Sequence, residues 1–209
     1  LPHRLRALGY ETVCIHPYPM GFFGRDRVFP NLGFGRFIDI ESFRNALRDG
    51  PYVADKAVAD KIAEVLDAAD RPTFVFAITM ENHGPLHLER ARLADVAGLY
   101  LKPPQSGWDD LTVYLRHLRN ADRMFGDLAE LLDERPRGGV LCLFGDHVPS
   151  MPKVYEDLGY GDPRTDYLIW PAVSVPRGRV DLDAHQLPAV LLAALAMAGQ
   201  SPPGTPGRR

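Results

Sequence analysis

The chain has 209 residues, of which 45% are hydrophobic and 24% are charged, so it is long enough to bury one sizeable core. Its formal net charge of −3, without any Lys/Arg block, excludes the electrostatic footprint of a nucleic-acid-binding protein. Two cysteines, Cys14 and Cys142, cannot build a disulfide framework, and both stand in apolar runs typical of buried thiols. No signal-peptide pattern is visible, and the longest apolar stretch is shorter than the roughly 20 residues of a membrane span.

Strand and helix signals alternate in the first half of the chain. Glycine and proline mark the ends of elements, apolar periodicity marks the helices, and short apolar runs mark the strands. Residues 17–35 are rich in Gly, Pro and aromatic residues, and their phenylalanines are expected to be buried, namely Phe22, Phe23, Phe29 and Phe34. The elements predicted, in chain order, are a helix end over 5–8, a strand over 11–15, a long ordered loop over 17–35, a helix over 55–69, a strand covered on both faces over 73–79, and a loop over 80–85.

The second half contains the strongest helical signal, in which apolar residues recur at spacings of three and four over 110–134. Residues 90–107 are ambiguous. The other elements predicted are a buried strand over 140–144, one edge strand over 167–170 and 172–175 interrupted by Pro171, a helix over 185–198, and a loose tail over 201–209.

This alternation favours an α/β fold, with a mostly parallel central sheet between two layers of helices. In such sheets ligands bind beyond the carboxyl ends of the strands. Three loops at these ends carry polar groups: the loop that begins at His16, the loop over 80–85, and Asp146-His147. We therefore expect the functional site to lie where these loops meet.

Asp146 and His147 directly follow a predicted strand and Gly145. A carboxylate oxygen and an imidazole nitrogen suit a divalent transition metal such as manganese or zinc. The alternative is that Asp146 caps a turn and His147 packs against its own loop. Two ligands do not complete a metal site, so the others must come from elsewhere.

Arg25 and His83 are candidates for holding an anionic oxygen. Arg25 lies among phenylalanines, where a guanidinium group is suited to a phosphate or sulfate, although an ion pair or ring stacking is the alternative. His83 lies in an Asn-His-Gly-Pro loop and is either a ligand-binding or a backbone-satisfied histidine. His16 ends a strand, a position that is more often structural. Glu81 is expected to face solvent, and His117, on a predicted helix, is assigned no chemistry.

Three segments together resemble the sulfatase-like branch of the alkaline phosphatase superfamily, and within it the lipoteichoic acid synthase and phosphoglycerol transferase group. The segments are TFVFAITMENHGP, YLRHLRNADRMFGDLAELL and GVLCLFGDHVPSMP. The opening 40 residues and the late TDYLIW and HQLPAVLLAALAMAG are similar to the same group. The resemblance covers roughly residues 1–199 and implies an alkaline-phosphatase-like fold that is incomplete at its N-terminus.

The resemblance implies a single divalent metal ion, often Mn²⁺, with Zn²⁺, Mg²⁺ or Ca²⁺ as other possibilities. Asp146 and His147 match the family's late pair of metal ligands. His83, Arg25 and His16 match residues that contact the phosphate or phosphoglycerol group, and Phe23 stands where the group often has Trp. The mechanism implied is transfer through a covalent phosphothreonine.

The family's early glutamate and nucleophilic threonine are expected upstream of a segment like residues 1–10. No catalytic nucleophile is therefore assigned in this chain. Either residues 1–200 are the C-terminal portion of a sulfatase-like catalytic domain, followed by a flexible tail over 201–209, or the chain is a catalytically dead version. The start at Leu1 favours a fragment, which is expected to be inactive by itself.

Three functions fit these observations. The first is a transferase that moves phosphoglycerol, or a similar phosphorylated head group, onto a cell-envelope glycan or lipid. The second is a sulfatase or phosphodiesterase acting on a sulfated or phosphorylated substrate, and the third is an inactive domain that binds a polyanionic polymer. The resemblance also implies a place on the periplasmic face of the bacterial inner membrane, with a membrane link only through a missing N-terminal region.

Overall fold

The structure is a computed structural model that describes residues 1–171 and 179–198 and divides into two compact units. Unit 1 consists of Leu1–Phe125 and Val148–Pro163, and unit 2 of Gly126–His147 and Arg164–Arg209. The predicted half-strand over 172–175 and the predicted tail over 201–209 lie outside the described residues.

Unit 1 carries the parallel sheet and most of the helices. The predicted strand over 11–15 is confirmed, and the strand over 73–79 and the helices over 55–69 and 110–134 are confirmed to within two residues at each end. The prediction that the strand over 73–79 is covered on both faces was wrong, because all its residues are half-buried and it is an edge strand of the sheet in unit 1. Its elements are α1 (Pro2–Ala7), β1 (Glu11–Ile15), η1 (Phe22–Gly24), α2 (Arg25–Asn31), β2 (Arg36–Ile38), η2 (Ile40–Phe43), β3 (Arg48–Asp49), β4 (Tyr52–Val53), α3 (Asp55–Asp67), β5 (Thr73–Ala77), η3 (Leu86–Leu88), α4 (Leu93–Leu99), the first part of α5 (Asp109–Asp133), and α6 (Pro152–Leu158).

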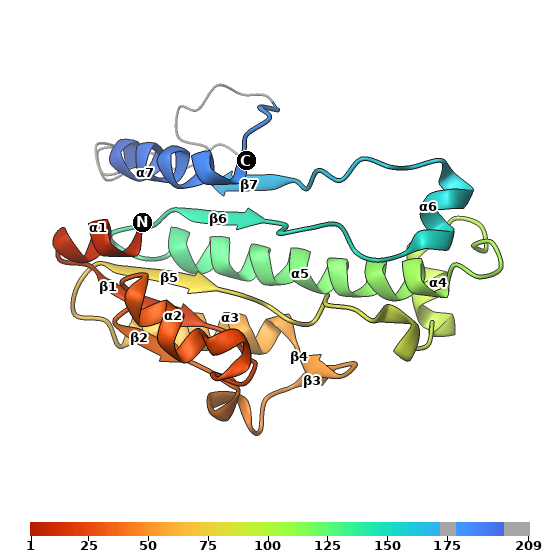
Figure 1. Ribbon diagram of the computed structural model, residues 1–209, viewed down its shortest axis with the longest axis horizontal. Helices are drawn as coiled ribbons and strands as arrows, with labels where there is room; N and C mark the ends of the chain where they lie inside the picture. Colours follow the sequence, from red (N-terminus) through yellow and green to blue (C-terminus); the bar gives the residue numbers. More distant parts are fainter. Residues whose placement is uncertain (172–178, 199–209) are drawn as a thin grey trace. The chain divides into compact units, whose positions relative to one another are not determined.

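The central sheet of unit 1 has the strand order β2-β1-β5, and all pairs are parallel. Helices α2 and α3 lie on opposite sides of it (Figure 1). Because side chains alternate along a strand, Cys14 joins Phe29 and Phe34 in the core on the side of α2. Val13 and Ile15 point the other way, and both are fully buried. The predicted α/β class with a parallel sheet is confirmed.

Residues 17–35 are not a plain loop, because they contain helix α2. Phe29 and Phe34 are buried as predicted. The prediction was wrong for Phe22 and Phe23, which are 43% and 81% exposed. Pro30 lies inside α2, and the other Gly and Pro residues that indicated a loop lie outside this short helix.

Helix α5 buries a polar face in unit 1. Thr112, Val113, Arg116 and His117 are buried, whereas Leu118, which belongs to the predicted apolar stripe, is 43% exposed. A helix can bury charged groups in this way only where partners of opposite charge meet them. The loops of unit 1 supply those partners, as described below.

Unit 2 contains the rest of α5, β6 (Leu141–Phe144), β7 (Tyr167–Trp170), η4 (Ala184–Gln186) and α7 (Leu187–Ala198). Strands β6 and β7 pair with each other in antiparallel fashion. The strand expected over 140–144 therefore exists, but it is not buried as predicted, since Leu143 and Phe144 are exposed. Among the helices of the described residues, none has both the length and the apolar character to span a bilayer.

Candidate functional site

Two of the three predicted loops come together in unit 1, at the carboxyl ends of β1 and β5. Ile15 and Ala77 are register partners in these parallel strands. His16 follows the first strand directly, and the loop that carries His83 follows the second. We call His16, Arg25 and His83 the basic cluster.

His16 is the buried member of the basic cluster, with 1% exposure. Its Nδ1 lies 2.9 Å from the Ile78 carbonyl oxygen, which can only accept, so Nδ1 carries the proton. Its Nε2 lies 2.7 Å from Nη1 of Arg25, which can only donate, so Nε2 accepts. The ring is therefore neutral, and it orients the guanidinium group of Arg25.

The electrostatic surroundings agree with a neutral His16. Burial is the main cause that lowers its pKa, and the positive charges of Arg25 and His83 lower it further. The hydrogen bond to the carbonyl of Ile78 acts in the opposite direction but does not outweigh burial. An imidazole held neutral in this way remains an acceptor for Arg25 at neutral pH.

Aromatic rings surround the guanidinium group of Arg25. Its Cζ lies 5.4 Å from the ring centroid of Phe22 and 5.7 Å from that of Phe23. Phe23 has a φ of 54°, a left-handed conformation that is uncommon for a bulky residue. This backbone keeps a large ring exposed beside Arg25 instead of folding it into the core.

His83 is the exposed member of the basic cluster. Its Nδ1 donates to the carbonyl oxygen of Gly84 at 2.6 Å, which leaves Nε2 as the nitrogen available to a ligand. The Tyr52 ring meets the imidazole edge-on, with centroids 5.8 Å apart. Arg25 and His83 thus offer cationic or donor groups suited to a phosphate or sulfate.

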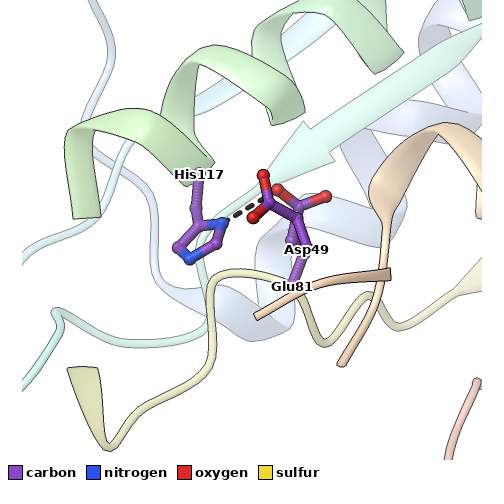
Figure 2. Close-up of side chains that lie close together, drawn as sticks. All are labelled: Asp49, Glu81 and His117. Carbon is purple, nitrogen blue, oxygen red and sulfur yellow. Dashed lines mark hydrogen bonds and ion pairs between the residues drawn. The ribbon is translucent and has the colours of Figure 1, made fainter. Parts of the chain in front are cut away.

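A second group of polar side chains lies beneath the loop that carries His83. His117 of α5, Glu81 of the loop and Asp49 of β3 point toward one another (Figure 2). Nδ1 of His117 donates to Glu81 Oε1 at 2.9 Å, and Nδ2 of Asn120 donates to both Glu81 (2.6 Å) and Asp49 (3.2 Å). Glu81 is 1% exposed, so the expectation that it faces solvent was wrong.

The same group extends to a buried arginine. Nη1 of Arg116 donates to Asp95 at 2.9 Å, and its Nη2 bonds Glu89. Nε2 of His117 lies 3.0 Å from Glu89 Oε1. We call the set that includes Asp49, Glu81, Glu89, Asp95, Arg116 and His117 the carboxylate network. Its paired charges explain how α5 can bury a polar face.

Donor atoms of Asp49, Glu81 and His117 lie within 4.8 Å of one another, which is close enough for a cation site. Both nitrogens of His117, however, already face carboxylates. Burial lowers the pKa of His117, but the hydrogen bonds to Glu81 and Glu89 outweigh it and raise the pKa above its ordinary value. A protonated imidazole cannot bind a metal, so the arrangement fits an ion-pair network better than a metal site.

Asp55, at the start of α3, is a buried carboxyl group beside this network. It is fully buried, and neither carboxyl oxygen has a hydrogen-bond partner among the protein atoms of the described residues. Burial first, and the charge of Glu81 second, raise its pKa to about 7. Its backbone N–H donates to Glu81 at 2.6 Å.

Asp146 and His147, the predicted metal ligands, belong to unit 2. Gly145 extends the β6–β7 ladder, because its N–H donates to the Asp166 carbonyl at 3.1 Å. The side chains of Asp146 and His147 are 78% and 68% exposed, and His147 Nε2 lies 3.8 Å from Asp146 Oδ2. One oxygen and one nitrogen at this separation fit two ligands of a divalent ion.

Sequence reasoning missed the carboxylate network and Tyr52. A signal was present, since His117 and Asn120 continue the spacing of Val113 and Met124, which lie buried on α5. Polar residues in phase with buried ones indicate partners within the fold. The identity of those partners depends on loops distant in sequence.

The fold is that of alkaline-phosphatase-like proteins. Lipoteichoic acid synthase LtaP from Listeria monocytogenes superposes with a TM-score of 0.60 at 21% identity, covering 75% of this chain and 39% of that protein. Phosphoglycerol transferase GacH from Streptococcus pyogenes, in complex with sn-glycerol-1-phosphate, gives a TM-score of 0.56 at 24% identity, covering 78% and 43%.

The chain belongs to the sulfatase family, whose model matches residues 1–187. The predicted resemblance to the sulfatase-like branch of the alkaline phosphatase superfamily is thereby confirmed. Capsular polysaccharide biosynthesis protein RkpI from Rhizobium meliloti is 33% identical over 173 residues, which are 81% of this chain. The chain spans only about a quarter of its curated relatives, 29% of RkpI and 24% of another Rhizobium meliloti protein.

Proposed function

We propose that this chain is part of a metal-dependent transferase that moves phosphoglycerol, or a similar phosphorylated head group, onto a glycan or lipid of the cell envelope. The observation that carries the proposal is the basic cluster. Arg25, oriented by the buried His16, and the exposed imidazole of His83 lie at the carboxyl ends of two neighbouring parallel strands. Such an edge is where α/β sheets bind ligands.

The donor groups favour an anionic oxygen ligand. Arg25 presents a planar fork that matches phosphate, and the Nε2 of His16 accepts a hydrogen bond from Nη1 of Arg25, which fixes the orientation of the fork. Nε2 of His83 donates a second hydrogen bond when the ring is protonated. Phe23 adds an exposed apolar surface beside Arg25, suited to the carbon chain of a glycerol or sugar. These residues would bind and orient the head group.

Asp146 and His147 are proposed to hold the divalent ion that sulfatase-family enzymes use, with Mn²⁺ as the expected metal. When bound, the ion would supply charge neutralisation to the phosphoryl oxygens. In unit 1, Arg25 and His83 would stabilise negative charge on a bound phosphate group. The threonine nucleophile is proposed to come from a part of the protein outside this chain, as is any membrane link, and the reaction is proposed to occur at the periplasmic face.

The test uses the full-length gene product with Mn²⁺, a fluorescent phosphoglycerol donor lipid and a glycan acceptor. Arg25→Lys keeps the charge but removes the fork, and is expected to lower kcat/KM by about 10- to 100-fold, as for a lost charge-assisted hydrogen bond. Arg44→Lys is the matched control, because Arg44 pairs with Glu41 on an exposed surface. An equal effect of both variants would contradict a role for Arg25.

The product identifies the reaction. Phosphoglycerol on the glycan supports the transferase. Release of glycerol phosphate into water, with or without glycan, supports the hydrolase that the sulfatase family model also allows. Binding of an anionic glycan without turnover, in a protein that retains no metal after dialysis, would overturn the enzymatic proposal in favour of a binding domain.

A further inference from the structure

The loop over 80–85 is anchored to the rest of unit 1 at its first residues. The Glu81 carboxylate accepts hydrogen bonds from the Asp55 N–H (2.6 Å), Asn120 Nδ2 (2.6 Å) and His117 Nδ1 (2.9 Å). Since Glu81 is buried, these three bonds satisfy a charge that would otherwise be costly. They fix one end of the loop to α3 and α5.

Tyr52 anchors the other end. Its hydroxyl group donates to the Gly84 carbonyl oxygen at 3.2 Å, and His83 Nδ1 donates to the same oxygen at 2.6 Å. A carbonyl oxygen has two lone pairs and can accept both bonds. The Tyr52 ring also meets the His83 ring edge-on, with an interplanar angle of 76°. Tyr52 therefore contacts the imidazole of His83 and also bonds the Gly84 carbonyl oxygen that accepts from this imidazole.

Tyr52 is itself held by the carboxylate network. It pairs with Asp49 in the β3–β4 hairpin, and Asp49 accepts from Arg92 (2.7 Å) and Asn120 (3.2 Å). Burial would raise the pKa of Asp49, but the hydrogen bond and charge of Arg92 hold it below its ordinary value, so the carboxylate is charged. Asn120 bonds Asp49 and Glu81 together, which links the two anchors.

We infer that Tyr52 is a positioning residue for His83. It fixes the ring orientation and keeps Nδ1–H bonded to the Gly84 carbonyl, so that Nε2 faces the ligand and donates to it once protonated, instead of exchanging its role with Nδ1. The inference rests on the proposed function in one respect, namely that His83 contacts the phosphorylated head group. The positioning of the ring by Tyr52 can be measured without any ligand.

The first measurement is the tautomer of His83, read from imidazole ¹⁵N chemical shifts of the histidine-labelled protein and assigned by comparison with His83→Ala. Tyr52→Phe keeps the ring and removes only the hydroxyl group. It is expected to shift His83 from one tautomer toward a mixture. Tyr155→Phe is the matched control, because Tyr155 also donates to a backbone carbonyl, that of Pro149 at 2.6 Å, but is not bonded to the loop. An unchanged His83 spectrum in Tyr52→Phe would overturn the inference.

The second measurement is the affinity for sn-glycerol-1-phosphate. Tyr52→Phe is expected to weaken binding by about 5- to 10-fold, the equivalent of one neutral hydrogen bond, whereas Tyr155→Phe leaves it unchanged. In the His83→Ala background, Tyr52→Phe should change affinity by less than about 2-fold, because its effect passes through His83. Equal losses in both backgrounds would overturn the inference. A wild-type protein that does not bind the probe would contradict the proposed function, while the ¹⁵N spectra would still decide the role of Tyr52.

Discussion

Replacing Asp55 with asparagine is expected to stabilise the protein at alkaline pH and to leave its stability nearly unchanged in acid. The carboxyl group of Asp55 is fully buried without a hydrogen-bond partner among the described residues, beside the negative charge of Glu81. Its ionised form is therefore unfavourable in the folded state. Asparagine has nearly the same shape and cannot ionise.

The expected magnitude follows from proton linkage. The pKa of Asp55 rises from 3.8 to about 7 on folding, so the folded state binds the proton more tightly than the unfolded state. This contribution favours folding fully below pH 3.8 and is lost as the pH rises to about 7. A difference of about 3 pKa units corresponds to about 4 kcal/mol, and relaxation around the charge reduces this to about 2–4 kcal/mol.

The assay is urea unfolding of the wild type and of Asp55→Asn between about pH 5 and pH 9. Most titrating groups are the same in the two proteins, so their contributions cancel in the difference between the two free energies of unfolding. It is expected to grow by about 2–4 kcal/mol toward pH 9 in favour of the variant. Asp60→Asn, at an exposed position of the same helix where Asp60 pairs with Lys56, should give a difference that varies by less than about 0.5 kcal/mol. Parallel stability curves for the wild type and Asp55→Asn would show that the pKa of Asp55 is not raised on folding.

Three further predictions concern stability and metal binding. His117→Ala removes one hydrogen-bond partner from the buried Glu81 and one from Glu89, which keep Asn120 and Arg116 as partners, and is expected to cost about 1.5–3 kcal/mol, measured by chemical unfolding at neutral pH; a loss below about 1 kcal/mol would contradict the network. Gly33→Ala should destabilise the protein, because Gly33 has a φ of +97° and an added Cβ would meet backbone at 2.7 Å, whereas Gly126→Ala, in α5 with nothing within 4 Å of an added Cβ, should raise stability by about 0.5–1 kcal/mol; thermal melts of the two variants should therefore move in opposite directions. Asp146→Ala and His147→Ala should each abolish retention of Mn²⁺ after dialysis, measured by elemental analysis, while changing stability by less than about 0.5 kcal/mol, because both side chains are exposed; full metal retention would show that the ion is held elsewhere.

Part of the candidate site was predictable from local pattern. His16, His83 and Asp146 each follow a strand that the sequence indicates, and the parallel pairing of β1 and β5 brings the first two together as expected for such a sheet. Arg25 was predicted as an anion-binding residue without its helix. The roles of these residues toward substrate and metal remain predictions.

The rest depended on contacts between residues distant in sequence. Glu81 was expected in solvent, yet it is buried because α5 supplies His117 and Asn120 some 36 and 39 positions away. Tyr52 gave no signal, since its importance comes from a carbonyl 32 residues further along the chain. The local sequence around a residue does not specify such long-range contacts.

The elements with strong periodicity or uninterrupted apolar runs were therefore predictable from the amino-acid sequence. These are β1, β5, α3 and α5, whose local preference agrees with the secondary structure that they adopt. Three features depend on long-range contacts: α5 buries a charged face, α2 forms within a Gly- and Pro-rich stretch, and β6 pairs with β7 in antiparallel fashion. The physical reason is that a buried charge or a short helix is stable only when partners from elsewhere in the chain meet it, and those partners are set by the fold.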